Sequence, residues 1–224
     1  MLNVGTNKIH QTYPHRLVLI LPMVGMVFFI ILYSAAAIDY SGGSYKMPTA
    51  NHFNFWHNYL CDLLDKKTYN GLANSSRYYA QAALATLCFS LMIIWFYVPL
   101  LFSLKSFHSR IIQITGILSM TTILFLSSER HDLIIRIAGI LGLVAITVLV
   151  KALIDFKYYK LAVGGCFCIL IFLLNYIIYE SGLYIKALPV IQKFTFVSFM
   201  GWFCLIDIAL YLYVYKKNIR KKLN

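Results

Sequence analysis

Charged residues are scarce in this chain of 224 residues: 12% are Asp, Glu, Lys or Arg, against about 25% in a typical soluble domain. Acids are the scarcest, with 8 Asp and Glu against 20 Lys and Arg. Hydrophobic residues make up 60% of the chain, and the mean hydropathy is +0.72. A soluble fold of this length can hide only about two thirds of its unfolded surface from water. The composition therefore argues against a soluble domain and favours an integral membrane protein.

Paired cysteines and cofactor motifs are also lacking. Four of the five cysteines lie in apolar runs (Cys88, Cys166, Cys168 and Cys204), and only Cys61 lies in a polar loop. We therefore expect no disulfide framework. The sequence has no nucleotide, dinucleotide or haem motif, which disfavours coupling to ATP and redox cofactors.

Six apolar segments are long enough to cross a bilayer as helices, which takes about 20 residues each. We expect an all-α, polytopic membrane protein with a single six-helix domain over residues 1–224. The first segment is expected to be a span, because its apolar run exceeds the roughly 7–15 residues of a signal peptide. The segments are Leu17–Ile38, Tyr79–Leu104, Ile111–Ser127, Leu133–Ile154, Leu161–Tyr179 and Phe194–Tyr215.

The charges outside these segments predict the orientation. Twelve of the 20 basic residues lie on one side of the predicted spans, and six of the 8 acids lie on the other. Basic loops stay in the cytoplasm, so we expect both termini there, in a prokaryotic cytoplasmic (inner) membrane. This distribution explains the net charge of +12 without nucleic acid or nucleotide as a partner, and leaves membrane lipids as the expected partners. The basic set is Lys8, Arg16, Lys105, Arg110, Lys151, Lys157, Lys160, Lys216, Lys217, Arg220, Lys221 and Lys222; the acidic set is Asp39, Asp62, Asp65, Glu129, Asp132 and Glu180.

One outer connection, residues 39–78, is much longer than the others. Long loops without regular structure are usually functional or disordered, and the many aromatic residues of this one argue against disorder. We expect it to form a cap between the first and second spans. If Trp56–Asp65 is helical, Asn58, Asp62 and Asp65 share one face. A turn at Tyr69-Asn70-Gly71 then ends the element.

The loop sequence Asn58-Tyr59-Leu60-Cys61-Asp62-Leu63 resembles a signature of the uncharacterised six-span membrane family DUF 998. That family has Asn-x-(Leu/Ile)-Ser-Asp-Leu-Gly in its first outer loop and a histidine that opens a later outer-side helix, here His131. Asn58, Leu60, Asp62 and Leu63 match, whereas Cys61 replaces the serine and Leu64 the glycine. The resemblance implies a fold and a site, without an established activity. The replacement of the serine by Cys61 makes a nucleophilic serine harder to carry over from the family, although the Cys61 thiol can replace a hydroxyl.

A second polar group surrounds the turn between the third and fourth segments, residues 127–132. Asp132 and Arg136 are four residues apart and can pair on one helix, and the long Arg136 side chain can extend outward. We expect His131, Asp132 and Arg136 to meet Asp62 and His57 in a polar pocket, with Glu180 at the same mouth. The alternative is an ordinary helix start in the headgroup zone.

The side-chain types that zinc accepts occur at His52, His57, Asp62, His131 and Asp132. No pair has a tight metal-binding spacing such as His-x-x-x-His. We therefore expect no metal cofactor, with zinc as the alternative.

Asp207 lies well inside the sixth segment. A carboxylate at such a depth costs about 2.5–3.5 kcal/mol and normally faces a partner in the bundle. Gln113, Thr115 and Lys151 are candidate partners. Asp207 is either a proton or ion relay or a polar clasp between helices.

Three functions fit these residues. We favour a protein that binds or moves a lipid or small amphiphile at an extracytoplasmic polar site, with ligand-binding residues Asn58, His57, Asp132, Arg136 and Glu180. The alternative is a membrane-embedded lipid hydrolase or transferase: His131 is general base or metal ligand, Asp62 orients it, and Cys61 or water attacks. Hydrolysis requires His131 and Asp62 within about 2.6–3.2 Å of each other, or sharing a metal. The third is an accessory subunit whose polar residues only stabilise loops.

Overall fold

The computed structural model describes residues 13–102, 106–127 and 130–223. Among them helices dominate, and β-structure is limited to one isolated bridge between Lys67 and Ala73. The all-α class is confirmed. The long helices are α1 (Arg16–Asp39), α2 (Arg77–Tyr97), α3 (Ser106–Ile123), α4 (His131–Asp155), α5 (Tyr159–Ser181) and α6 (Leu188–Leu223); the short 3-10 helices are η1 (Cys61–Leu64), η2 (Val98–Leu101) and η3 (Ile185–Ala187).

In the described part of the chain, five helical stretches are long and apolar enough to cross a membrane. They are Arg16–Asp39, Arg77–Leu101, His131–Asp155, Tyr159–Ser181 and Ile185–Ile219. The third predicted span is occupied mainly by α3, which has 18 residues and opens with the polar sequence Ser106-Phe107-His108-Ser109-Arg110. α3 is not among the five stretches. The five stretches support the predicted transmembrane helical character, and the number of six spans stays a prediction.

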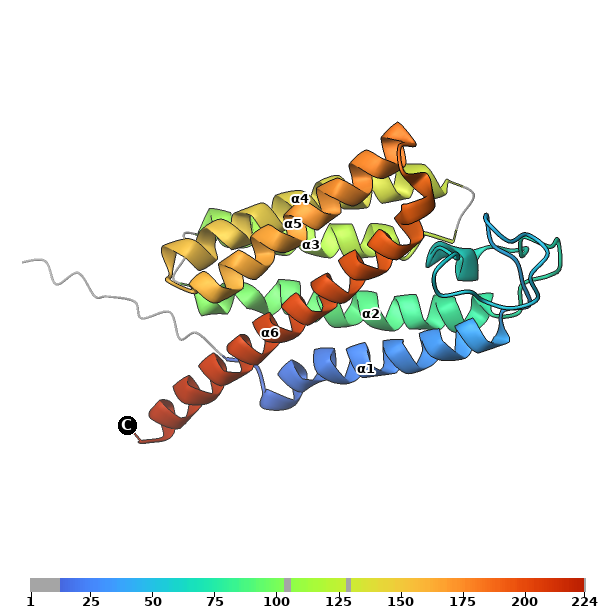
Figure 1. The fold of residues 1–224 in the computed structure, drawn as a ribbon. Helices are drawn as coiled ribbons and strands as arrows, with labels where there is room; N and C mark the ends of the chain where they lie inside the picture. Colours follow the sequence, from blue (N-terminus) through green and yellow to red (C-terminus); the bar gives the residue numbers. More distant parts are fainter. Residues whose placement is uncertain (1–12, 103–105, 128–129, 224) are drawn as a thin grey trace, which may run out of the picture.

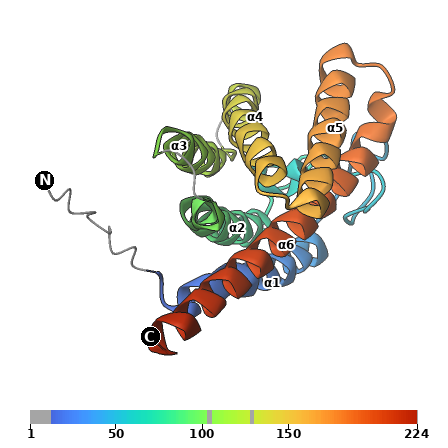
Figure 2. The same cartoon turned by 90° about the vertical axis from the view of Figure 1, so that its left-hand side faces the viewer.

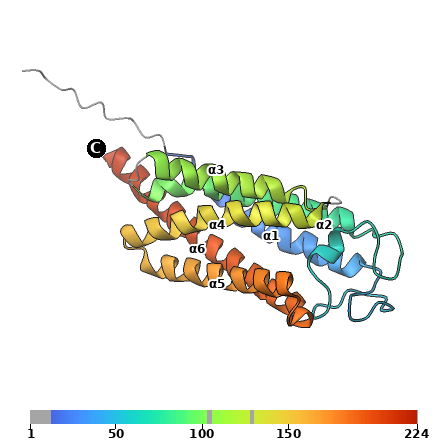
Figure 3. The same ribbon diagram turned by 90° about the horizontal axis from the view of Figure 1, so that it is seen from above.

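The described long helices pack in the order of the sequence, and α6 returns to contact α1 and α2 (Figure 1). α6 crosses the bundle obliquely (Figure 2). The start of α1 meets the end of α6, since the rings of Tyr13 and Tyr213 lie 6.5 Å apart and Arg16 lies 4.7 Å from the ring centroid of Tyr215. The connection between α1 and α2 lies at the opposite end of the bundle (Figure 3), which we call the capped end.

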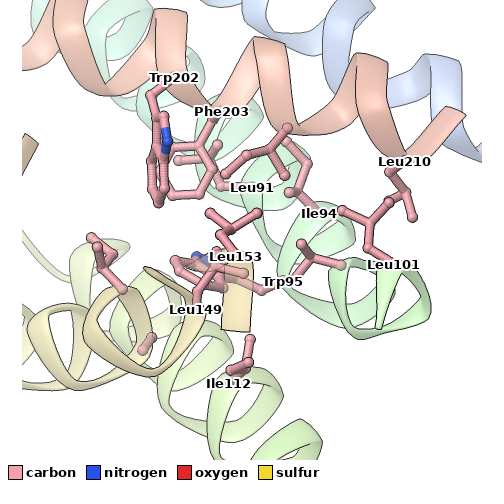
Figure 4. Close-up of a cluster of buried hydrophobic side chains, with 14 of the residues drawn as sticks. Leu91, Ile94, Trp95, Leu101, Ile112, Leu149, Leu153, Trp202, Phe203 and Leu210 are labelled. Carbon is pink, nitrogen blue, oxygen red and sulfur yellow. The ribbon is translucent and has the colours of Figure 1, made fainter. Parts of the chain in front are cut away.

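The hydrophobic core lies between α2, α4 and α6 (Figure 4). Trp95 of α2 and Phe203 of α6 pack edge to face with ring centroids 5.3 Å apart, and Leu149 of α4 is 0% exposed. Trp202 donates to the Leu161 carbonyl of α5 at 2.8 Å. Such dense contacts hold the helices in place and so set the positions of the side chains at the capped end.

Residues 40–76 form the cap. The condition that Trp56–Asp65 is helical is met only over Cys61–Leu64, which forms a 3-10 helix. The cause is local: the Asn54 side chain accepts hydrogen bonds from the backbone N–H groups of Trp56 (2.9 Å) and His57 (3.2 Å). An Asn side chain used in this way closes a turn and competes with helix formation.

The predicted turn at Tyr69-Asn70-Gly71 is confirmed. Gly71 has a φ of +84°, a conformation that favours glycine. Its N–H donates to the Thr68 carbonyl at 2.9 Å. This turn closes the second half of the cap and returns the chain to α2.

Candidate functional site at the capped end

Asn58 and Asp62, the two polar residues of the loop signature, are buried, with exposures of 0% and 5%. The Asn58 amide donates to Asp62 Oδ2 (2.8 Å) and to the Gly43 carbonyl (2.7 Å). Asn58 Oδ1 accepts from the Asn54 N–H (2.8 Å), and Asp62 Oδ2 accepts from the Tyr59 N–H (2.9 Å). The two residues meet as expected, although in a turn and not on a helix face.

Lys193 of α6 reaches the same place, and the sequence analysis missed it. The side chain is only 5% exposed. Its ammonium donates to the carbonyls of Asn58 (2.5 Å) and Pro189 (3.0 Å), and lies 5.2 Å from the ring centroid of Phe55. Lysine is rarely buried unless it is paired, so these contacts are what allow its burial. The sequence signal was a lysine directly before the apolar run that starts at Phe194.

Two further side chains fix the cap to the bundle. Gln192 Oε1 accepts from the Leu60 N–H (3.0 Å), and the Tyr33 hydroxyl of α1 donates to the Leu60 carbonyl (2.6 Å). We call Tyr33, Asn58, Asp62, Gln192 and Lys193 the cap anchor. The anchor ties the loop to both the first and the last helix of the bundle.

Burial changes the pKa of the Asp62 carboxyl. It raises the pKa of Asp62 to about 6, although the hydrogen bonds from Asn58 and Tyr59 and the charge of Lys193 lower it in part. Burial also raises the pKa values of the Tyr40 and Tyr69 hydroxyls to about 12, and the nearby Asp62 charge adds to both shifts. Asp62 is therefore the group of the anchor that changes charge near pH 6.

Cys61 lies beside the anchor, with its Sγ 4.0 Å from Gln192 Nε2. Burial, followed by the charges of Asp62 and Asp65, raises the pKa of the Cys61 thiol to about 12. Because the thiolate is the nucleophilic form, this environment favours the protonated, less nucleophilic thiol of Cys61.

The second polar group joins α4 to α5 at the capped end. We call His131, Asp132, Arg136, Tyr179 and Glu180 the rim cluster. Arg136 donates from Nε to Glu180 Oε1 (3.0 Å) and from Nη2 to Oε2 (3.2 Å). The Tyr179 hydroxyl donates to Asp132 Oδ1 (2.6 Å), and His131 Nδ1 lies 3.4 Å from the same oxygen. The predicted Asp132–Arg136 pair is not formed among the described residues, because Glu180 offers Arg136 both oxygens in a bidentate arrangement.

No hydrogen bond joins His131 to Asp62 within residues 13–102, 106–127 and 130–223. Asp62 is bonded inside the cap anchor and His131 lies against Asp132. The loop acid that feels the charge of His131 is Asp65: burial raises its pKa, and His131 and Arg77 lower it in part. Nε2 of His131 and Nδ1 of His57 are buried without a hydrogen-bond partner among the described residues.

Among the residues that the structure describes, no three His, Cys, Asp or Glu side chains gather closely enough to hold a metal ion. His52 is exposed, and His57 and His131 are half-buried. The zinc alternative therefore has no ready donor set in this part of the chain.

Asp207 of α6 is 0% exposed, and neither of its carboxyl oxygens has a hydrogen-bond partner in the described chain. Two candidate partners bond to backbone carbonyls instead: Gln113 to Phe96 (2.7 Å) and Thr115 to Ile111 (2.7 Å). The third, Lys151, is exposed. The clasp that the sequence suggested for these residues is not formed.

The chain matches no family model, no curated protein and no solved structure. The resemblance to DUF 998 stays a prediction. The argument about function therefore depends on the two polar groups of the capped end.

Proposed function

We propose that this chain is a six-span protein of a prokaryotic cytoplasmic membrane, with both termini inside and the capped end outside. At the capped end the rim cluster binds the polar headgroup of a membrane lipid or a small amphiphile. The cap anchor holds the cap over this end and takes no part in chemistry.

The observation that carries the proposal is that the Arg136 guanidinium is exposed and only partly hydrogen-bonded. Its side chain is 51% exposed and is oriented through Nε and Nη2 by Glu180. Nη1 has no hydrogen-bond partner among the described residues. An arginine has five N–H donors, so this guanidinium retains donors suited to a phosphate oxygen.

The charges around Arg136 favour one class of headgroup. Glu180 and Asp132 are acids on the same rim, and Asp132 is exposed. A purely anionic headgroup meets repulsion from these carboxylates. A headgroup with both a phosphate and an ammonium, such as phosphoethanolamine, can place its phosphate on Arg136 and its ammonium beside the acids.

The hydrolase alternative receives less support from the described residues. It requires an activated nucleophile and a base oriented by Asp62. The environment of Cys61 raises the pKa of its thiol to about 12, and Asp62 is bonded to Asn58 and Tyr59. A binding role requires neither feature.

Lipid retention tests the proposal. The protein is purified in mild detergent, and the phosphatidylethanolamine and phosphatidylglycerol retained per protein are measured by mass spectrometry. Arg136→Ala is expected to lose retained phosphatidylethanolamine several-fold, whereas Lys151→Ala retains it. Lys151 is the matched control, because it is an exposed cation at the other end of α4.

Glu180→Gln sharpens the test. Removing this acid should shift retention toward phosphatidylglycerol, because less repulsion then opposes an anionic headgroup. Equal retention by Arg136→Ala, Lys151→Ala and the unchanged protein would rule out the rim cluster as the site.

A further inference from the structure

Phe55 and Trp56 form a pair of exposed aromatic side chains at the tip of one cap turn. They are 55% and 58% exposed, and their rings pack edge to face with centroids 5.1 Å apart. Two large aromatic side chains in contact make a small exposed apolar patch on the cap.

Contacts with Asn54 and Lys193 hold the aromatic pair in place. The Asn54 side chain accepts from the Trp56 N–H at 2.9 Å and fixes the turn. The Lys193 ammonium lies 5.2 Å from the centroid of the Phe55 ring and donates to the Asn58 carbonyl at 2.5 Å. The cation–π contact and the hydrogen bonds orient the pair relative to α6.

The contact with Lys193 gives the height of the pair along the bundle. Phe194, the next residue of α6, is 62% exposed, and Val197 is 68% exposed. The exposed apolar face continues along the helix at Leu205 (56%) and Leu212 (49%). In a bundle that spans a bilayer, this exposed apolar face is the part of α6 that would meet hydrocarbon, and Phe55 would then stand near the level where the hydrocarbon begins.

We propose that Phe55 and Trp56 contact the interfacial zone of the outer leaflet, with Trp56 at the level of the phospholipid headgroups. Tryptophan and other aromatic residues concentrate at this level because their rings are apolar with a polar edge. The cap then lies partly on the membrane surface beside α6. This inference requires that the bundle spans a bilayer, and it is independent of ligand binding at the rim cluster.

Tryptophan fluorescence tests the inference, because Trp56 is the exposed one of three tryptophans. Trp95 and Trp202 are 1% and 3% exposed. The full chain is reconstituted into phosphatidylcholine vesicles, and the emission of Trp56→Phe is subtracted from that of the unchanged protein. The difference signal is measured with iodide in the water and with phospholipids that carry a nitroxide on the headgroup or near the middle of the acyl chain.

The expected result is a Trp56 emission shifted to the blue of free tryptophan, quenched most by the headgroup nitroxide and only weakly by iodide. Strong quenching by iodide with none by lipid would mean that the cap stands in water. Protection from every quencher would mean that protein, including a second copy, covers the pair. Strongest quenching at mid-chain would place the pair too deep. Each of these three outcomes overturns the proposal.

A second variant controls for the possibility that Trp56→Phe itself changes the structure of the cap. Phe55→Trp in the Trp56→Phe background moves the reporter by one residue on the same exposed turn. It should give the same order of quenchers. Gel filtration of each variant confirms that the fold is retained.

Discussion

The capped end contains two groups of polar side chains, the cap anchor and the rim cluster, and they differ in how far they are buried. The cap anchor buries Asn58, Asp62 and Lys193, whose exposures are 0%, 5% and 5%. In the rim cluster, the side chains of Arg136 and Glu180 are 51% and 35% exposed. Buried polar groups that lose a partner cost far more than exposed ones. The anchor is therefore built into the fold, whereas the rim side chains are accessible, as the proposed headgroup binding requires.

The largest expected effect is at Asn58. Asn58→Ala removes the donor to Asp62 Oδ2 and to the Gly43 carbonyl and leaves both buried. We expect a loss of about 2–4 kcal/mol in the free energy of unfolding. Thermal or denaturant unfolding in detergent measures it.

Asn51→Ala is the matched control, because Asn51 is an exposed asparagine of the same cap. Its expected change is within about 0.5 kcal/mol. Equal effects of the two substitutions would remove the distinction between buried and exposed polar groups on which the comparison depends.

The second largest effect is expected in how the stability of the cap depends on pH. The pKa of Asp62 rises from 3.8 to about 6 on folding, so between these values the folded state binds more protons than the unfolded state. The free energy of opening the cap therefore falls as pH rises from about 4 to about 6. Two pKa units correspond to roughly 3 kcal/mol as an upper limit.

Hydrogen exchange of the Asn58 and Tyr59 amides, corrected for intrinsic rates, measures this dependence. Asp62→Asn has no charge to titrate and should remove most of this dependence, leaving the smaller part that comes from Asp65, whose pKa burial also raises. Stability of the cap that increases over the same pH range would show that hydrogen bonds and Lys193, and not burial, dominate the titration of Asp62.

A smaller effect is expected at Asp207, the other buried acid. Unlike Asp62, it has no hydrogen-bond partner for either oxygen among the described residues. Asp207→Val replaces an unpaired buried carboxyl with an apolar side chain and should stabilise the protein by about 1–3 kcal/mol. A destabilised Asp207→Val would mean that the Asp207 carboxyl makes a stabilising contact in the folded protein.

The smallest effect on stability is expected at the rim. Arg136→Ala breaks an exposed pair and should cost about 0–1 kcal/mol. The exchanged variant, Arg136→Glu with Glu180→Arg, should recover the stability lost by either single change. A loss of more than about 2 kcal/mol in Arg136→Ala would make the rim cluster a structural clasp between α4 and α5.

Sequence patterns were informative for contacts between residues that are close in the chain. The distance of four residues between Asn58 and Asp62 placed them on one side of a possible helix, and in the structure they are joined by a hydrogen bond. The turn at Gly71 followed from its residue types. The sequence analysis left open whether Trp56–Asp65 is helical, and the Asn54 side chain closes a turn at its start instead. Propensity and spacing do not reveal which of two local hydrogen-bond patterns a chain selects.

Contacts between distant segments could not be predicted in this way. Lys193 and Asn58 are 135 residues apart, and Gln192 and Leu60 are 132 apart. Arg136 and Glu180 were both recognised as site residues, but the sequence paired Arg136 with Asp132. Which acid an arginine binds depends on how closely α4 and α5 pack, and a single sequence does not contain that distance.

The most direct test compares Asn58→Ala with Arg136→Ala in one preparation, measuring both the unfolding midpoint and the phosphatidylethanolamine retained per protein. The account predicts that Asn58→Ala lowers the midpoint and that its folded fraction retains lipid. It predicts that Arg136→Ala leaves the midpoint nearly unchanged and loses the lipid. The account is contradicted if Arg136→Ala retains the lipid, or if it loses lipid only in proportion to a loss of folded protein.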